Sequence, residues 1–204
     1  HEVIRLSGMN LIIDDNDHQL IIKVASIPSA RVQIYFIDND DYFSRKAILH
    51  DEQGAEFSDN DERAIFFARG VLETVKKLRW APTVVHCHGW ISAIVPLYLK
   101  RVFSDDPIFH DLKIVLSVYD DAFTAPLDAN FRAKIESEGM GDENLSILDT
   151  PSYENLYRYV MQCVDGVVLA SPHVNEEVEK LVRESGKPLL EYQDPESAEC
   201  FDNY

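Results

Sequence analysis

Two histidines and a short acidic segment stand where the sequence predicts strands to end. His86 and His88 are two residues apart in an extended stretch, so both imidazoles project from the same side of the chain. The segment Tyr119–Asp121 follows a second apolar run. Imidazoles exchange protons near neutral pH, carboxylates accept hydrogen bonds from hydroxyl groups, and aromatic rings stack on sugar rings. These residue types predict a pocket for a sugar or a phosphate, with a carboxylate available as a general base.

A metal ion and a purely structural role are the alternatives for these residues. Imidazoles at this spacing are able to ligate zinc, but a third ligand would have to come from Asp120 or Asp121, and none is visible in the sequence. We therefore predict no metal site. The histidines could also be satisfied at a strand end, and the acids could cap a solvated loop. Cys87, between the two histidines, points to the other face and is predicted to be core.

Three apolar, β-branched runs with helices between them must position these side chains. They cover residues 83–88, 112–118 and 166–170. Strands that alternate with helices form βαβ units, which predict an α/β fold with a doubly wound, mostly parallel sheet. Ligands bind such sheets at the carboxyl ends of the strands. There we expect His86–Gly89, Tyr119–Asp121 and Ala170–Ser171 to converge.

The remaining segments predict a β meander, several helices and one long loop. Runs rich in β-branched residues at 9–13, 19–27 and 31–37 form the N-terminal meander. Apolar periodicity predicts helices over residues 58–78, 90–102 and 153–164. The segment 122–150 is irregular, with one helical piece at 131–138.

Helix caps and the last strand complete the expected organisation. The helix over residues 58–78 offers Ser58 with Asp61, or Asp59 with Glu62, as a capping box. Another helix is predicted to begin at Ser171–Pro172, because proline suits the first helical position. A short strand is expected over residues 187–190. We find no repeat and no second domain, so residues 1–204 are predicted to form a single domain.

The composition argues against several classes of protein. The chain has 204 residues and a net charge of -17, which disfavours nucleic acid and anionic membrane as partners because both are polyanions. The three cysteines have no C-x-x-C spacing and fit a reducing compartment. The apolar run 90–99 is too short to span a bilayer, so we expect a cytoplasmic protein. There is no G-x-G-x-x-G, P-loop or G-x-S-x-G motif, and no cofactor is predicted.

Several stretches, in the same order, resemble the family of bacterial glycogen synthases and plant starch synthases. The segment Val84-Val-His-Cys-His-Gly-Trp90, followed by Ala93-Ile-Val-Pro-Leu-Tyr-Leu99, is similar to the family's Val-Val-His-x-His-Asp-Trp and Pro-x-Tyr-Leu motifs. Residues 37–45 resemble its Tyr-Phe-x-Arg loop, and residues 58–67 its Asp-Asn-x-x-Arg-Phe helix start. Residues 114–120 fall where the family has Thr-Val-His-Asn, and residues 163–172 where it has Ala-Asp-x-x-x-x-Val-Ser-Pro.

The resemblance implies a Rossmann-like half of a two-domain glycosyltransferase. The family reaction is retaining glucosyl transfer from ADP-glucose to the non-reducing end of an α-1,4-glucan. The resemblance places Tyr119 and Asp120 at the family's active-site position, although we assign no catalytic residue. With His86, His88 and Trp90 they are the predicted substrate-binding residues. The expected ligands are an α-glucan or maltooligosaccharide, with ADP-glucose as the family's donor.

Relative to this family, the chain is expected to be an N-terminal-type domain without glucosyltransferase activity of its own. Compared with the family, it is expected to lack the first strand with the Lys-x-Gly-Gly-Leu loop, and the C-terminal domain that supplies basic residues for the diphosphate. Gly89 stands where the family has Asp, and Tyr119 and Asp120 where it has His and Asn. A phenol has a much higher pKa than an imidazole and does not reproduce its role.

Two other hypotheses remain open at this point. The chain could be a non-catalytic α-glucan-binding or regulatory module that keeps an acceptor surface. It could instead be one half of a split nucleotide-sugar transferase whose C-terminal-type domain is a separate, basic polypeptide. The net charge of -17 makes such a partner electrostatically reasonable.

Overall fold

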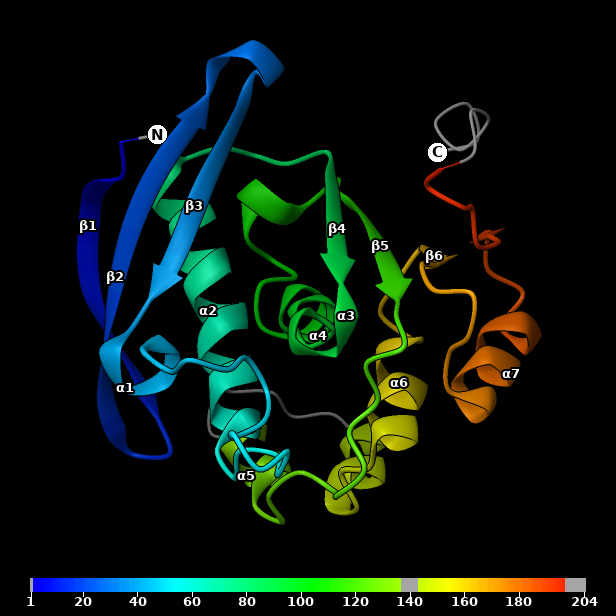
Figure 1. The fold of residues 1–204 in the computed structure, drawn as a ribbon. Coiled ribbons are helices and arrows are strands. Elements are labelled where there is room, and N and C mark those ends of the chain that lie inside the picture. The colour runs from blue at the N-terminus through cyan, green and yellow to red at the C-terminus, as the bar shows by residue number, and fades with distance from the viewer. Residues whose placement is uncertain (1, 137–142, 197–204) are drawn as a thin grey trace. The chain divides into compact units, whose positions relative to one another are not determined.

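The computed structural model describes residues 2–136 and 143–196. The chain divides into two compact units, His1–Trp80 and Ala81–Tyr204, which we call unit 1 and unit 2 and describe separately (Figure 1). Each unit is built around a sheet of its own. The expectation of one domain over residues 1–204 stays a prediction.

Unit 1 contains the predicted meander as an antiparallel sheet in the order β1-β2-β3. Its strands are β1 (Ile4–Ile13), β2 (Asn16–Ile27) and β3 (Val32–Asp38). Asp14 and Asp15 have positive φ angles of 48° and 60° and join β1 to β2 as a two-residue hairpin. Aspartate tolerates this left-handed backbone better than most residues, so the acidic turn fits the twist of the strands. A 3-10 turn at Pro28–Ala30 leads into β3.

Two helices complete unit 1, α1 (Asp40–Phe43) and α2 (Asn60–Leu78). The predicted helix over residues 58–78 is thus confirmed to within two residues, but its capping box is wrong. Asp59 occupies the N-cap position without a side-chain cap bond, because its carboxylate is engaged by the guanidinium of Arg45. Helix α2 approaches the sheet closely at Gly70, where a Cβ would lie 2.6 Å from Cγ2 of Ile37.

Unit 2 contains a parallel sheet in the order β4-β5-β6-β7. The strands are β4 (Val84–His88), β5 (Lys113–Val118), β6 (Gly166–Leu169) and β7 (Leu189–Leu190). The helices that connect them are α3 (Gly89–Ser92), α4 (Val95–Arg101), α5 (Phe131–Glu136), α6 (Tyr153–Val160) and α7 (Glu176–Glu184). Further 3-10 turns cover Pro107–Phe109 and Glu143–Asp149. The predicted α/β class, the parallel sheet and the N-terminal meander are confirmed.

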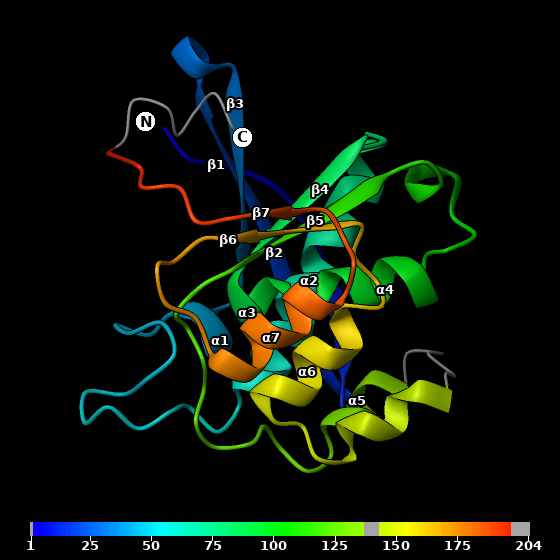
Figure 2. The same ribbon diagram turned by 90° about the vertical axis from the view of Figure 1, so that its right-hand side faces the viewer.

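The helices of unit 2 gather on one face of its sheet. The strands are ordered in the sheet as they are in the chain, β4-β5-β6-β7. Right-handed crossovers between parallel strands in this order place every connecting helix on the same face of the sheet. Figure 2 shows α3, α4, α6 and α7 on the same side of β5, β6 and β7. The strand residues on that side are buried, among them Cys87, Leu116 and Val167, and the prediction for Cys87 is confirmed. His86, His88 and Ser117 project from the opposite face.

Several helix boundaries in unit 2 differ from the prediction, among them the end of α6, which lies at Val160 and not at residue 164. The expected helix over residues 90–102 is divided into α3 and α4, and Pro96, in the first turn of α4, has no N–H to continue a preceding helix. Helix α7 begins at Glu176 with Asn175 as its N-cap, so the predicted start at Ser171–Pro172 is wrong. The hydroxyl of Ser171 instead accepts a hydrogen bond from the backbone N–H of Asp120.

Other predicted elements agree with the structure. The helical piece expected at 131–138 is α5, although its last two predicted positions lie outside the described residues. The predicted strands over 83–88, 112–118, 166–170 and 187–190 correspond to β4, β5, β6 and β7. In the described part of the chain, no helix combines the length and the apolarity that a membrane crossing requires.

Candidate functional site

The two predicted histidines lie side by side at the end of β4. Their ring centroids are 4.1 Å apart, and the planes are inclined by 34°. Nε2 of His86 shares a hydrogen bond of 2.8 Å with Oγ of Ser117, and Nδ1 of His88 shares one of 2.9 Å with the hydroxyl of Tyr119. The histidines on β4 are therefore held in place by two side chains from β5 and the residue that follows it.

The register of the two strands explains this arrangement. His88 is the direct neighbour of Ser117 in the parallel pairing of β4 with β5. Because alternate residues of a strand share a face, Ser117 and Tyr119 project on the same side as the histidines. Each histidine contacts the hydroxyl residue two places beyond its own pairing partner. The convergence of His86, His88 and Tyr119 that the sequence predicts is present in the structure.

Burial keeps both imidazoles neutral near pH 7. The pKa of His86 is lowered by burial and further by the neighbouring His88, and the pKa of His88 is lowered by burial. A neutral imidazole offers one N–H donor and one acceptor nitrogen. With the hydroxyl of Tyr119, the pair therefore presents both donors and acceptors for the hydroxyl groups of a ligand.

A turn at Gly89 connects these histidines to the following helix. Gly89 has a φ of +72°, and a Cβ at this position would lie 2.6 Å from Oδ2 of Asp121. That oxygen accepts the backbone N–H of Trp90 at 2.9 Å, and Oδ1 accepts the hydroxyl of Tyr153 at 2.8 Å. The carboxylate thus fills the space beside the glycine and links the start of α3 to the start of α6.

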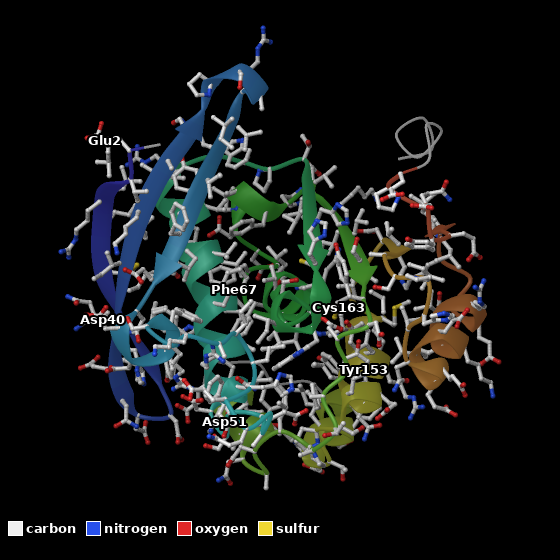
Figure 3. All side chains as sticks on the ribbon, viewed as in Figure 1. Glu2, Asp40, Asp51, Phe67, Tyr153 and Cys163 are labelled. Carbon is white, nitrogen blue, oxygen red and sulfur yellow. The ribbon has the colours of Figure 1, made fainter. Side chains whose placement is uncertain are left out.

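The carboxyl group of Asp121 is held in an environment that penalises its charge. Burial raises its pKa, and the hydrogen bonds from Trp90 and Tyr153 act in the opposite direction without cancelling the effect. Burial also raises the pKa of Tyr153, the labelled first residue of α6 in Figure 3, which therefore stays protonated and donates to the carboxylate. Asp121 serves as a fixed structural acceptor in this arrangement.

Trp90 and Asp120, both predicted to bind substrate, have different surroundings. The side chain of Trp90 is only 1% exposed and packs edge-on against Phe123, with the ring centroids 4.9 Å apart. The first turn after Gly89 directs the Trp90 side chain into the core. Its ring therefore packs beneath the surface of the site and is not available to a ligand. Asp120 is exposed at the strand end, and its N–H is held by Ser171. The expected meeting of the segments after β5 and β6 is present.

Two residues of the site were not predicted as site residues. Ser117 is a buried polar residue within an apolar strand, and its alternation with Tyr119 was a signal for the shared face. Tyr153 is the first residue of the helix that apolar periodicity predicts over residues 153–164, and no sequence pattern indicates its hydrogen bond to Asp121. The assignment of His86, His88, Tyr119 and Asp120 to substrate binding stays a prediction.

The arrangement is suited to binding hydroxyl groups and offers no other evident chemistry. Among residues 2–136 and 143–196, no three His, Cys, Asp or Glu side chains are grouped so that they could hold a metal ion. Ser117 and His86 have the spacing of a nucleophile and its base, but Ser117 is 0% exposed and its hydroxyl cannot reach a substrate. Burial raises the pKa of the Cys87 thiol to about 12, so this residue is not a thiolate nucleophile.

Comparison with known proteins identifies related sequences and folds. Residues 1–190 match the family model described as the starch synthase catalytic domain. A glycogen synthase of Chlorobium limicola is 40% identical over 121 residues, which cover 59% of this chain and 25% of the relative. A glycogen synthase of Chlorobaculum tepidum is 34% identical over 155 residues, which cover 71% of this chain and 32% of the relative.

A solved structure extends the comparison to the fold. The catalytic domain of starch synthase IV from Arabidopsis thaliana, bound to ADP and acarbose, superposes with a TM-score of 0.71 at 15% identity. The match covers 95% of this chain and 41% of that one. The chain therefore spans about a quarter to a third of the length of these glycogen synthases and less than half of the solved chain.

Proposed function

This chain belongs to the family of starch synthase catalytic domains, and we propose that it forms the acceptor side of an α-1,4-glucan synthase that takes glucose from ADP-glucose. The observation that carries the proposal is the group of His86, His88 and Tyr119 at the ends of β4 and β5. Their neutral rings and hydroxyl suit the hydroxyl groups of a terminal glucose unit. The ADP and acarbose in the solved starch synthase IV structure support ligands of the same kind.

The residues at the two strand ends have different roles in the proposed site: some contact the ligand, and one positions its neighbour. His88 and Tyr119 exchange hydrogen bonds with sugar hydroxyls, while His86, tied to the buried Ser117, holds the ring of His88 in position. Asp120, exposed beside Tyr119, accepts further hydroxyl hydrogen bonds. The transfer of glucose requires groups for the donor diphosphate that we do not assign to this chain.

Titration with maltohexaose tests the acceptor role. We expect binding by the full chain, and on the order of tenfold weaker binding by His88→Ala and Tyr119→Ala, because each substitution removes hydrogen bonds to the sugar. His110→Ala is the matched control, since this exposed histidine lies before the other end of β5. Equal affinity of all four proteins would contradict the proposal.

A second candidate is a non-catalytic glucan-binding module, and Tyr119 favours it. The resemblance to the family places an imidazole at this position, and a phenol does not take its role in proton transfer. An assay of glucan elongation from ADP-glucose separates the two candidates. The binding module predicts maltohexaose binding without elongation, even when a C-terminal starch synthase domain is added, whereas the synthase half predicts elongation once that domain is present.

A further inference from the structure

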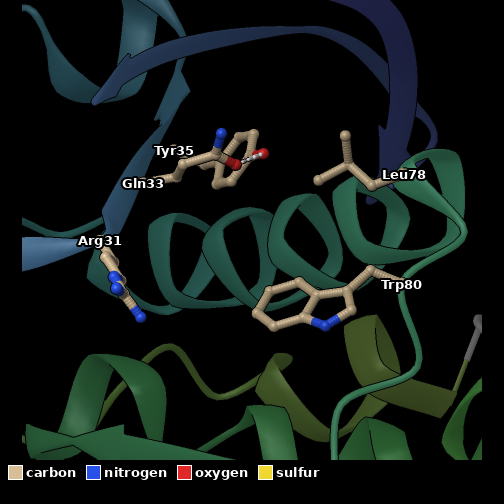
Figure 4. A pocket seen from close by; sticks show the side chains of 5 residues that line it. All are labelled: Arg31, Gln33, Tyr35, Leu78 and Trp80. Atoms are coloured by element: carbon tan, nitrogen blue, oxygen red, sulfur yellow. Dashed lines mark hydrogen bonds between the residues drawn. The ribbon is translucent and has the colours of Figure 1, made fainter. Parts of the chain in front are cut away.

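Unit 1 contains a groove that has no part in the strand-end site. It has a volume of about 460 Å³ and is lined by Arg31, Gln33, Tyr35, Leu78 and Trp80. Figure 4 shows Leu78 and Trp80 projecting from the end of α2, with the other three side chains on or beside β3. Its volume is within the range of about 300–1,000 Å³ that is typical of small-molecule sites.

Helix α2 contacts the sheet of unit 1 closely at one point, and hollows adjoin the helix. At Gly70 the helix comes close to Ile37, near the end of β3. Side chains of α2 from Phe67 to Leu78 line a second, adjoining hollow of about 210 Å³. The two hollows share Tyr35, Leu78 and Trp80, so the aromatic side chains stand where the groove and its apolar extension meet.

Trp80 provides an exposed aromatic surface in this groove. Trp80 is 60% exposed, whereas Trp90, the other tryptophan of the chain, is 1% exposed. The backbone at Trp80 is fixed, because Arg79 ends α2 with a φ of 51° and the N–H of Trp80 donates to the carbonyl of Val75. The backbone that carries the indole is therefore held in place, while the residue stays largely exposed to solvent.

Polar groups beside the indole are arranged to donate hydrogen bonds. The hydroxyl of Tyr35 donates to Oε1 of Gln33 at 2.6 Å, which orients the amide and leaves its NH₂ group as a donor. Arg31 adds a guanidinium with several donors. None of the described residues that line the groove is acidic.

We propose that this groove binds a neutral oligosaccharide, with a hexose ring stacked on Trp80 and its hydroxyls bound by Gln33 and Arg31. A sugar ring has an apolar face that suits the indole and hydroxyl groups that suit the amide and guanidinium. A strongly anionic ligand fits less well, because the described lining residues offer it one cationic side chain, Arg31, on a chain of net charge -17. The choice of an α-glucan as the oligosaccharide rests on the proposed function.

Native gel electrophoresis in gels that contain glycogen tests the groove with the full chain. We expect Trp80→Ala and Gln33→Ala to weaken the retardation of the chain by glycogen about tenfold, as the loss of an aromatic stack or an oriented donor predicts. Ile48→Ala is the matched control, because it also removes an exposed apolar side chain from unit 1. Two-dimensional NMR with maltohexaose adds a second readout, in which the indole N–H signal of Trp80 is expected to shift.

The outcomes for the groove and for the strand-end site are distinguishable. Loss of retardation in Trp80→Ala, with retention in His88→Ala, supports the groove even if the proposed acceptor role fails. Loss in His88→Ala alone, with an unmoved Trp80 signal, overturns the groove and leaves the proposed function standing. A retardation that none of these substitutions changes overturns both. A Trp80 signal that shifts with an apolar peptide but not with maltohexaose also overturns the proposal, since the groove would then be a peptide site.

Discussion

At the scale of single residues, the strand-end site depends on hydrogen bonds between side chains that the chain separates by about thirty positions. The contacts between His88 and Tyr119 and between Trp90 and Asp121 each span 31 residues. Two of these residues, His88 and Tyr119, face outward, while Trp90 and Asp121 build the support beneath them. The physical difference is burial: the outer pair can exchange hydrogen bonds with a ligand, whereas the inner pair is committed to the fold.

The lowered pKa values of His86 and His88 predict a loss of stability in mild acid. As the pH falls below the ordinary pKa of 6.5, the histidines bind protons in the unfolded chain before they do so in the folded chain. The unfolding free energy therefore decreases as the pH falls through this range. Urea unfolding between about pH 7 and pH 5.5 measures this effect, and His86→Asn should reduce the pH dependence. The raised pKa of Asp121 has the opposite sign, because the folded chain then binds the proton more readily than the unfolded chain. An unchanged slope in His86→Asn would refute the assignment.

Gly89 is predicted to be the least replaceable of the described glycines of unit 2. Gly89→Ala introduces a Cβ at a φ of +72° and within 2.6 Å of Oδ2 of Asp121, so we expect a loss of about 2–4 kcal/mol in unfolding free energy. Gly186→Ala is the control, because Gly186 has a similar φ of +70° with nothing within 4 Å of the added Cβ, and should lose only about 1 kcal/mol. Urea denaturation compares the two, and equal losses would show that Asp121 does not restrict the position.

At the scale of elements, caps and breaks were harder to predict than the elements themselves. Apolar periodicity identified α2, α6 and the strands because many residues contribute to each pattern. A helix start depends on one or two hydrogen bonds, and several residues can compete for them. Ser171 had the right type for a cap, but its hydroxyl accepts from Asp120 instead. Asp59 likewise had the right type, but its carboxylate is bound by Arg45.

The corrected start of α7 gives a prediction at Asn175. Its Oδ1 accepts the backbone N–H of Val178, so Asn175→Ala should lower the unfolding free energy by about 1 kcal/mol. Asn175→Ser keeps a cap acceptor and loses only the hydrogen bond to Glu154, and should recover most of this loss. Thermal or urea unfolding measures both variants. A serine variant as unstable as the alanine variant would mean that the bond to Glu154, and not the cap, stabilises the helix.

At the scale of the whole molecule, the net charge of -17 should affect the affinities for the two ligands of the proposed reaction, the glucan and ADP-glucose, differently. A neutral maltooligosaccharide is insensitive to this charge, whereas the diphosphate of ADP-glucose is repelled by it. Because no diphosphate-binding groups are assigned to this chain, we expect ADP-glucose to bind it weakly, and this weak binding to strengthen on the order of threefold when the salt concentration increases from about 20 to 200 mM, since salt screens the repulsion. Maltohexaose affinity, measured by calorimetry under the same conditions, should not change. A fall in ADP-glucose affinity would instead indicate a local cationic site.

The sequence by itself determined the α/β class, the meander, the parallel strands and the family, because each rests on patterns that run through many consecutive residues. It also brought His86, His88 and Tyr119 to one edge, since strand alternation and parallel register suffice for that. Only the tertiary structure decided that Trp90 is buried, that Asp121 occupies the space beside Gly89, and that Tyr153 donates to it. The same holds for the groove beside Trp80. These features depend on how far one element lies from another, and a linear pattern does not contain that distance.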